Sequence, residues 1–593
     1  MPFRFFTILL AFVTAAMPAF TESGIGDKVG TLVLKDIRYL PRTLEEVGEA
    51  QYYVLFFMTN SCPLARRYLP RVAELEKAYL DRGVRVVGIN VGPQETIMDM
   101  AWHALEFDID MPLLKDMDGE VAKKLGVTRT PEVVILDKDM VMRYRGRVDD
   151  QYRLGGVRPD VSREDLKIAL DELLAGKEVS EPETKSEGCS VEFPTVPEPE
   201  TPVTFSEHIA PIMYKNCASC HREGGGGPFP LVTYEQVSAK ARMVEEVVRE
   251  GRMPPWYAHP GFGTFENAMR LSDEEKLQVR QWLAAGKPQG DPARTPEAPT
   301  FAESEWQIEP DLILTVSNPV APPPDGYVPY KYLFLPHKFE HDTWVQGIEI
   351  KPSNKAVVHH ANLIFTDDQY KFVKDNQFLT GYVPGGSPAV LDANRALLIP
   401  KGSILALQVH YVTTGRVEKD QISVGFRFAK ERIQKRSYYT MFEVLRNLEI
   451  PPYARAHKVV DAHVMDEPTT GIALFSHMHL RGRDMTFYAH YPDGTSEVLM
   501  SLPNYNFDWQ LTYMYPPGEK QIPAGTKIEC VAHYDNSPFN PYNPDPSKTV
   551  EHGPQTIDEM FNGFYVYTKD NEQLNLDVDP NTGAPLTEVA AAE

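Results

Sequence analysis

The chain of 593 residues contains only five cysteines, and Cys530 is the only one after position 220. The C-terminal half therefore cannot form an internal disulfide bond, and packing of its core must stabilise it. Basic residues are also scarce, because 60 Lys and Arg stand against 83 Asp and Glu, for a net charge of −23. Nucleic acids and anionic lipids require clustered Lys and Arg, so this charge argues against both as partners.

Long apolar runs are missing as well. After the N-terminal apolar run, no stretch stays apolar for about 18 residues, the length of a membrane span. Residues 1–20 show the pattern of a cleaved signal peptide, in which Arg4 precedes the apolar run Phe5–Val13 and small residues follow around Ala16. An uncleaved anchor is the alternative, although the run is short for one. The sequence thus predicts a periplasmic or secreted protein with no stable membrane span.

The length predicts about four folding units, at roughly 150 residues per domain. Hydrophobic periodicity disappears from Glu178 to Pro202, where Pro, Glu, Thr and Ser dominate, and a second shift in composition runs from Lys287 to Thr300. These shifts predict extended linkers at 178–203 and 288–309. The polar, acidic residues 571–593 predict a disordered tail. Three modules remain between these segments: 25–177, 204–287, and a long third module that divides into 310–440 and 441–570.

The first module alternates strand and helix patterns. Its apolar runs predict strands at 52–58, 84–90 and 133–136, and a helix at 69–79. A last helix carries four leucines on one stripe, and we expect Ser162 to open it with Asp165 and Gly176 to end it. This order predicts an α/β sheet layered with helices.

Cys62 follows the first of these strands, at the start of a helix, where the helix dipole lowers the pKa of a thiol. Thr130-Pro131 precedes another strand, a position from which a cis proline can face that thiol. On these residues, 25–176 resembles the thioredoxin and peroxiredoxin superfamily. Ala65 stands where a CxxC motif has its second cysteine, so a local CxxC pair is excluded.

The second module contains the motif Cys217-Ala218-Ser219-Cys220-His221. Its two thiols can form thioethers with heme vinyl groups, and its histidine can ligate the iron. One helix is expected about 205–214, and another is expected to open at Ser272 and to end at Gly286. The motif between paired helices resembles an all-α class I cytochrome c domain with one covalent heme c.

The cytochrome c resemblance implies a methionine as the second axial ligand of the heme. Met253 is the candidate, since two prolines and a tryptophan follow it on a loop between the helices. Met213 and Met269 are the rivals, because methionine often only fills a core. Thioether ligation would raise the heme potential, as suits an electron carrier.

Heme takes two of the five cysteines and leaves Cys62, Cys189 and Cys530. Cys189 lies in the first predicted linker, from which it can reach Cys62 as a redox partner. The reactivity of a thiol depends on its surroundings, so the alternative is that Cys62 is inert and the first module is a structural adaptor.

The third module has strand patterns, many prolines and almost no long helical periodicity, so all-β sandwich structure is expected. Twelve of the sixteen histidines lie from His337 onward. His477 and His479 alternate along a strand, so they can hold one metal together. His359 and His360 are adjacent, and sharing a metal requires a strand end or a twist. Imidazole sites that include a thioether favour copper over zinc.

This module contains four motifs, which follow one another along the chain: Val358-His359-His360, Leu407-Gln408-Val409-His410-Tyr411, His477-Met478-His479 and Asp558-Glu559-Met560. On them, residues 310–568 resemble the type II ascorbate-dependent copper monooxygenases, the family of peptidylglycine alpha-hydroxylating monooxygenase and dopamine beta-monooxygenase. The resemblance implies two jelly-roll-like sandwiches with one copper ion each across an open cleft. It assigns His359, His360 and His410 to the electron-transfer copper, and His477, His479 and Met560 to the oxygen-binding copper.

The same resemblance implies an enzyme that hydroxylates a C–H bond of a small-molecule or peptide substrate with O2. His477, His479 and Met560 would form its catalytic site, and a donor such as ascorbate or a redox protein would supply two electrons per turnover. Phe475 stands where the peptide hydroxylases have an Arg that holds a substrate carboxylate. This departure disfavours a glycine-extended peptide and favours an apolar or aromatic substrate.

The order of the modules suggests that the heme at His221 passes electrons to the copper half. Short flexible linkers would raise the effective concentration of each redox partner to roughly the mM range. The alternative is a noncatalytic copper and heme protein for electron relay or copper delivery. A carrier needs neither a second copper site nor access for O2, so six separate ligands favour catalysis.

Overall fold

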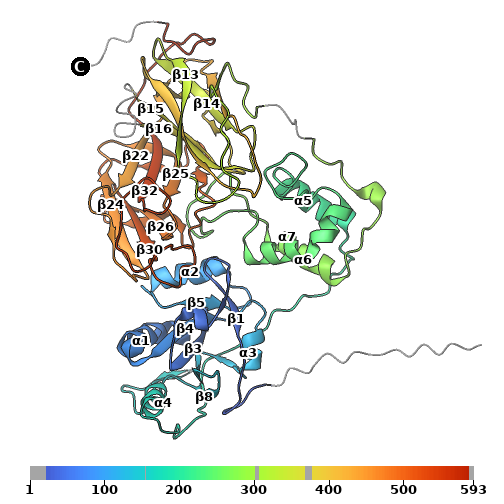
Figure 1. The fold of residues 1–593 in the computed structure, drawn as a ribbon, viewed down its shortest axis with the longest axis vertical. Helices are drawn as coiled ribbons and strands as arrows, with labels where there is room; N and C mark the ends of the chain where they lie inside the picture. The colour runs from blue at the N-terminus through green and yellow to red at the C-terminus, as the bar shows by residue number, and fades with distance from the viewer. Residues whose placement is uncertain (1–21, 154, 301–305, 367–376, 587–593) are drawn as a thin grey trace, which may run out of the picture. The chain divides into compact units, whose positions relative to one another are not determined.

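The computed structural model describes residues 22–153, 155–300, 306–366 and 377–586. The predicted signal peptide, at 1–20, lies outside these residues. The chain forms two compact units (Figure 1). The smaller unit contains the described parts of Met1–Asp36, Leu40–Glu95 and Met111–Pro194. The larger unit contains the described parts of Ile37–Tyr39, Thr96–Asp110 and Thr195–Glu593, so the second and third predicted modules belong to one unit.

A seven-stranded mixed sheet forms the centre of the smaller unit, in the order β2-β1-β5-β4-β3-β7-β8 (Figure 1). Its strands are β1 (Val33–Asp36), β2 (Pro41–Thr43), β3 (Tyr52–Met58), β4 (Val84–Asn90), β5 (Leu113–Lys115), β7 (Glu132–Asp137) and β8 (Met142–Gly146). β3, β4 and β5 run parallel, and the other pairs are antiparallel. The helices of this unit include α1 (Pro63–Tyr79), α3 (Glu120–Lys124) and α4 (Asp165–Leu174). The α/β architecture predicted for the first module is confirmed.

Two helices of the first module begin at residues other than those predicted. α1 begins at Pro63, well before the predicted start, because Cys62 is its N-cap and proline favours the first helical position. α4 begins at Asp165 after the N-cap Glu164. Ser162 does not cap it, because the Ser162 backbone N–H donates to the Asp150 carboxylate at 2.8 Å instead.

The first predicted linker is not an extended, free segment, because it belongs to the smaller unit as far as Pro194. The hydroxyls of Thr184 and Tyr144 are hydrogen-bonded at 2.7 Å, and Glu183 pairs with Arg145. Farther along, β11 (Cys189–Ser190) pairs antiparallel with β6 (Arg129–Thr130). Main-chain and polar contacts hold this segment, which is why hydrophobic periodicity did not reveal it.

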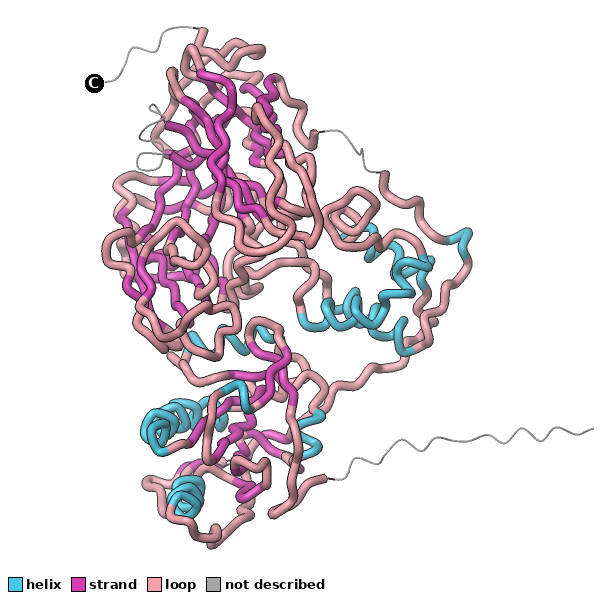
Figure 2. Tube along the Cα trace, in the orientation of Figure 1, coloured by secondary structure: helices cyan, strands magenta, loops and turns pink. Residues whose placement is uncertain are grey.

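Residues 204–287, all within the described part of the chain, contain helices joined by long loops and no strand, as Figure 2 shows by colour. A π-helical turn (Phe205–Ile209) leads into α5 (Ala210–Asn216), and α6 (Tyr234–Glu250) and α7 (Asp273–Ala284) follow. As predicted, Ser272 caps α7 in a capping box with Glu275. The three helices share one core, which includes Met213, Val244 and Trp282. These short helices do not by themselves show a cytochrome c fold, which stays a prediction.

The first half of the C-terminal region is a β-sandwich. One sheet has the order β12-β20-β14-β18-β21, with β17 also paired to β14, and the other has the order β13-β19-β15-β16. The strands are β12 (Leu312–Thr315), β13 (Lys331–Lys338), β14 (Thr343–Lys351), β15 (Val358–Thr366), β16 (Gln377–Tyr382), β17 (Ala389–Val390), β18 (Arg395–Ile399), β19 (Ile404–Tyr411), β20 (Ser423–Phe428) and β21 (Lys435–Arg436). Ile348 and Phe426 of one sheet share a buried core with Leu363 and Leu407 of the other.

A second β-sandwich follows. Its sheets have the orders β22-β32-β25-β28, with β29 paired to β25, and β24-β30-β26-β27. The strands are β22 (Tyr438–Glu443), β24 (His457–Val464), β25 (Thr469–His477), β26 (Gly482–His490), β27 (Ser496–Leu502), β28 (Thr512–Met514), β29 (Gln521–Ile522), β30 (Lys527–Tyr534) and β32 (Asn562–Lys569). The sheets approach closely at Gly563, where an added Cβ would lie 2.7 Å from the Cys530 sulfur. The largely all-β character predicted for this region is confirmed.

The ends of the predicted segments shift in the structure. β22 pairs with β32, so the second sandwich begins before the predicted boundary at residue 440. The predicted disordered tail is ordered through residue 586: Leu576 pairs with Ile433 and packs in a core beside Trp344. The two apolar residues Leu576 and Val578 anchor an otherwise acidic segment. Among the described residues, no helix has both the length and the apolar character needed to cross a membrane.

Candidate functional site

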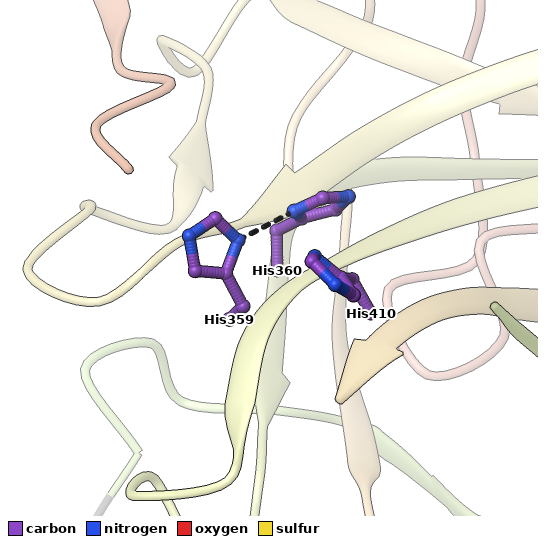
Figure 3. Close-up of side chains that lie close together, drawn as sticks. All are labelled: His359, His360 and His410. Atoms are coloured by element: carbon purple, nitrogen blue, oxygen red, sulfur yellow. Dashed lines mark hydrogen bonds between the residues drawn. The ribbon is translucent and has the colours of Figure 1, made fainter. Parts of the chain in front are cut away.

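Three histidines of the first sandwich meet at the ends of two neighbouring strands. His359 and His360 lie on β15 and His410 on β19, and the antiparallel register places His360 opposite His410. One ring nitrogen from each histidine lies within 4.8 Å of those of the other two. The Nδ1 atoms of His359 and His360 are 3.0 Å apart (Figure 3). The sequence prediction that these three residues form one group is consistent with this geometry.

An irregularity in β15 explains how adjacent histidines reach one point. The register between β15 and β19 shifts between Val358 and His360. A shift of this kind bends a strand and redirects its side chains, so consecutive residues need not point to opposite faces. The sequence analysis required a strand end or a twist at this position, and the structure has a register shift near the start of β15.

The protonation of this group suits metal binding. Burial lowers the pKa of His360 far below its usual value and that of His410 to about 3, so both rings are neutral and keep a lone pair. The Asp508 carboxylate accepts a hydrogen bond from Nε2 of His359 at 3.1 Å. Nδ1 is then the nitrogen of that ring that can bind a metal. Within the described part of the chain, the buried Nδ1 of His410 has no hydrogen-bond partner. Three imidazoles grouped in this way fit a copper ion.

The second sandwich supplies the other histidine pair. His477 ends β25, and the rings of His477 and His479 have their centroids 5.0 Å apart. Asn562 at the start of β32 is the register partner of His477. The backbone N–H groups of His479 and Met560 both donate to the Glu559 carboxylate, which brings the two residues close together. The imidazole pair and the thioether predicted from the sequence therefore come to the same end of this sandwich.

Neighbouring side chains orient these two rings. Gln510 accepts a hydrogen bond from Nδ1 of His477 at 2.6 Å, and the Asp558 carbonyl accepts one from Nδ1 of His479 at 3.3 Å. In both rings Nε2 is therefore the nitrogen that can bind a metal ion. Among the described residues, the buried Nε2 of His479 has no hydrogen-bond partner. A buried, unpartnered nitrogen beside a second imidazole fits a copper site.

Glu559 supports the loop that carries these ligands. Its carboxylate is fully buried and accepts hydrogen bonds from the backbone N–H groups of His479, Arg481 and Met560. Burial raises the pKa of Glu559 to about 7. The sequence analysis quoted this residue within a motif without giving it a role, and the structure makes it the anchor of the loop.

The two histidine groups adjoin, whereas the resemblance implied that they face each other across an open cleft. The rings of His360 and His477 have their centroids 6.1 Å apart. Phe507 packs against histidines of both groups, and so does Tyr330. These two aromatic side chains fill the space between the sandwiches. Sequence patterns did not mark either residue, because neither lies near a histidine motif.

A cavity of about 690 Å³ reaches His360 of the first group and Gln510, the hydrogen-bond partner of His477. His360 and Gln510 line one part of it. Elsewhere it is lined by Phe378 of β16, Phe475 of β25 and Phe564 of β32, whose ring centroids lie 5.2 to 6.1 Å from one another. A space of this size, lined by three aromatic rings and by the His360 imidazole, can hold a small organic molecule.

The predicted heme residues lie together after α5. His221 donates a hydrogen bond from Nδ1 to the Phe229 carbonyl at 3.0 Å, which leaves Nε2 for iron. Its backbone N–H bonds to the Cys217 carbonyl at 2.8 Å, so Cys217 and His221 belong to one turn that also contains Cys220. Cys217 and Cys220 are free thiols. This donor set fits covalent heme attachment.

The candidate axial methionines differ in burial. Met213 is fully buried in the core of the three helices, which accounts for it as packing. Met253 is half-buried on the loop after α6, and Met269 lines the cavity described above. The assignment of Met253 as the axial ligand stays a prediction.

Cys62 is buried as the N-cap of α1, and its thiol donates to the Thr130 carbonyl at 3.0 Å. The peptide bond between Thr130 and Pro131 is cis, as the sequence suggested. Burial raises the pKa of Cys62, but hydrogen bonds from the Cys189 thiol and from backbone N–H groups outweigh it, so the pKa lies below its usual value. Burial and the neighbouring Cys62 raise the pKa of Cys189 to about 11.

Residues 25–145 match the AhpC/TSA family model. This part of the chain is an AhpC/TSA thioredoxin-like domain. No curated protein matches the chain. Similar solved structures include a hypothetical protein from Sinorhizobium meliloti, which is 28% identical over 30% of this chain and 97% of its own, with a TM-score of 0.28. An uncharacterized conserved protein from Geobacillus kaustophilus is 30% identical over 29% of this chain and 93% of its own, with a TM-score of 0.27.

A third similar structure is a secreted disulfide oxidoreductase from Mycobacterium tuberculosis that is homologous to Escherichia coli DsbE. It is 20% identical over 19% of this chain and 79% of its own, with a TM-score of 0.17. The AhpC/TSA domain confirms the thioredoxin-like part of the sequence prediction and suggests an oxidoreductase. It does not bear on the heme and copper assignments.

Proposed function

We propose that this protein is an exported copper-dependent monooxygenase that hydroxylates a C–H bond of an apolar organic substrate with O2. The observation that carries the proposal is the meeting of two imidazole groups beside an aromatic cavity, with unpartnered buried nitrogens on His410 and His479. A structural histidine is usually hydrogen-bonded when it is buried. Two such nitrogens in adjoining groups favour two metal ions.

Copper held by these residues would supply cycling between Cu(I) and Cu(II) and the activation of O2. The protein's own contribution is orientation. Asp508 directs Nδ1 of His359 toward the first site, and Gln510 directs Nε2 of His477 toward the second. The Glu559 carboxylate holds the backbone N–H groups of His479 and of Met560. The two sites thus have different donor atoms, which supports different roles in electron transfer and in oxygen binding.

The cavity supports an apolar or aromatic substrate. The Phe378 and Phe475 rings are stacked at 16°, and Phe564 packs against both. The aromatic side chains would hold an apolar group by packing against it, and Gln510, the partner of His477, lines another part of the same cavity. Exclusion of water by the aromatic side chains would also limit uncoupled loss of electrons to O2.

The heme motif supports an internal electron donor. An added Cβ at Gly385 would lie 3.4 Å from the Cys220 sulfur and 3.9 Å from the Trp509 ring, so the absent side chain lets these groups approach. Trp509 follows Asp508, which is hydrogen-bonded to His359. A heme held by Cys217, Cys220 and His221 would supply electrons, and Gly385 and Trp509 would lie between it and the His359 site. Trp509→Leu should slow reoxidation of reduced heme by the copper-loaded protein without changing the heme spectrum.

The test of the activity uses the full chain loaded with heme and copper, with ascorbate as reductant and isotopically labelled O2. A panel of small aromatic and aliphatic compounds is screened for labelled hydroxylated product. A labelled product supports the monooxygenase. O2 uptake that couples to no compound, together with transfer of copper to an acceptor protein, would instead identify a copper carrier.

A pair of variants sharpens this test. Met560→Ala should abolish substrate-coupled O2 uptake while the His359 group retains its copper and the heme spectrum stays unchanged. Met441→Ala removes a half-buried methionine of β22 that is not among the proposed ligands, and it should leave O2 uptake intact. Equal losses in both variants would show a general structural effect and contradict the proposed role of Met560.

Export rests on the N-terminal sequence. Mass analysis of protein recovered from the exported compartment should show a chain that begins after the predicted signal peptide at 1–20. A full-length chain confined to the cytoplasm would contradict this part of the proposal.

A further inference from the structure

A segment of the first predicted linker is bound to the AhpC/TSA domain as an added strand. Cys189 and Ser190 of β11 are the register partners of Thr130 and Arg129 of β6. The Val191 N–H donates to the Thr128 carbonyl at 3.0 Å. The Arg129 guanidinium donates to the Gly188 carbonyl at 3.2 Å and to the Ser190 hydroxyl at 3.0 Å. This mode of binding is that of an extended peptide added to a strand edge.

Glycine at 188 allows this close approach. An added Cβ there would lie 2.0 Å from the Thr130 carbonyl oxygen. The same oxygen accepts the hydrogen bond from the Cys62 thiol. Any larger residue at 188 would push the segment, and Cys189 with it, away from Cys62.

Cys189 and Cys62 meet at Thr130, which is the register partner of Cys189 and accepts the hydrogen bond from the Cys62 thiol, and the two thiols differ in acidity. The Cys189 thiol donates a hydrogen bond to the Cys62 sulfur, and this contact favours the Cys62 thiolate while Cys189 keeps its proton. Arg129 is the charged group beside Cys189. The Glu95 carboxylate accepts hydrogen bonds from the Asn60 and Ser61 N–H groups and so fixes the loop before Cys62. The pair therefore has a nucleophile and a proton-bearing partner.

We propose that Cys62 and Cys189 form a reversible disulfide centre, in which residues 188–191 occupy the groove for a disulfide-bearing peptide and Cys189 is the built-in resolving cysteine. The segment must leave β6 to admit such a peptide, because Cys62 is 1% exposed beneath it. The proposal does not depend on copper, heme or the monooxygenase activity.

The reaction is thiol–disulfide exchange. The Cys62 thiolate attacks one sulfur of the peptide disulfide, the peptide S–S bond breaks, and the first peptide thiolate leaves and takes up a proton. Cys189 then attacks the Cys62 sulfur of the mixed disulfide, and the second peptide thiolate leaves with the proton that Cys189 held. One peptide disulfide is reduced to two thiols, while the Cys62 and Cys189 thiols are oxidised to one disulfide.

The test incubates reduced, heme-loaded full chain with a synthetic peptide pair joined by one disulfide, and digests are mapped by mass spectrometry. The wild type should release both peptides as thiols and yield a linked Cys62–Cys189 fragment. Cys189→Ser should accumulate a mixed disulfide between Cys62 and one peptide. Cys62→Ser should form no adduct, and Cys530→Ser, which removes a buried core thiol, should behave as the wild type.

Access through the bound segment is tested separately. Arg129→Ala removes the side chain that holds Gly188 and Ser190, so mixed-disulfide formation by Arg129→Ala/Cys189→Ser should be several-fold faster than by Cys189→Ser alone. Arg143→Ala, which removes an arginine paired with Asp137 in the same domain, is the matched control and should not change the rate. The proposal is overturned if the wild type stays fully reduced with the peptide pair, or if Cys189→Ser traps no adduct.

Discussion

Gln510 accepts a hydrogen bond from Nδ1 of His477 at 2.6 Å, inside a region where both side chains are buried. The contact decides which ring nitrogen of His477 faces the neighbouring His479. It joins two residues that are 33 positions apart in the chain.

Gln510→Ala should lower copper affinity at the His477 group by about 10- to 100-fold, the usual cost of losing a ligand's hydrogen-bond partner. The ring would lose the acceptor that fixes its orientation. Competition with a chromophoric Cu(I) chelator measures the affinity. Gln510→Glu keeps an acceptor and should stay close to the wild type, while Gln346→Ala, a buried glutamine of β14, should not change affinity. An unchanged affinity in Gln510→Ala would contradict the orienting role.

Met253→Ala should lower the reduction potential of the heme and remove the red absorption band of methionine–iron ligation, because thioether ligation raises the potential. Met213→Ala and Met269→Ala should retain that band. Potentiometric titration followed by absorbance checks all three variants. If Met269→Ala alone loses the band, Met269 is the axial ligand instead.

Leu363→Ala should reduce the free energy of unfolding of the first sandwich by about 2–5 kcal/mol, the usual cost of a cavity in a packed core. Leu363 is fully buried where the two sheets meet. Leu445→Ala makes the same change at a position that is 48% exposed and should cost less than about 0.5 kcal/mol. Denaturant unfolding of the full chain compares the two variants, and similar costs would be inconsistent with this core.

The reaction of Cys62 with a small disulfide reagent should retain its full rate to lower pH than an ordinary thiol allows. The thiolate is the nucleophile, and hydrogen bonds, chiefly from Cys189, overcome burial and lower the pKa of Cys62. The rate therefore falls only as the pH drops through that lowered pKa. Cys189→Ala removes the main donor, so its midpoint should move to higher pH. Stopped-flow rates across pH give both midpoints, and equal midpoints would contradict the contact.

The same lowered pKa links Cys62 to folding. A thiol whose pKa is lower in the folded chain than in the unfolded chain contributes stability above the unfolded pKa. That contribution is lost as the pH falls through the folded pKa. As the pH falls through the folded pKa of Cys62, the reduced wild type should therefore lose stability relative to Cys62→Ser. Unfolding curves recorded under reducing conditions at several pH values measure this difference.

Local patterns in the sequence were sufficient for much of the fold. Period-2 and apolar runs located β3 and β4, and the Ser272 and Glu275 pair located the start of α7. These signals succeed because backbone conformation depends on residues a few positions apart. Ser162 failed as a cap because Asp150, twelve residues earlier, takes its N–H, and Leu576 belongs to a core whose other members lie far away in the chain.

The sequence by itself determined the local motifs on which the proposals rest: Cys217, Cys220 and His221 in one short motif, the histidine motifs, and Cys62 at a helix start. Only the tertiary structure brought Gln510, Asp508 and Phe507 to those histidines and Cys189 to Cys62. The physical reason is that ligand types and their local spacing are set along a strand, whereas the partners that orient them arrive from other strands and loops when the sheets pack.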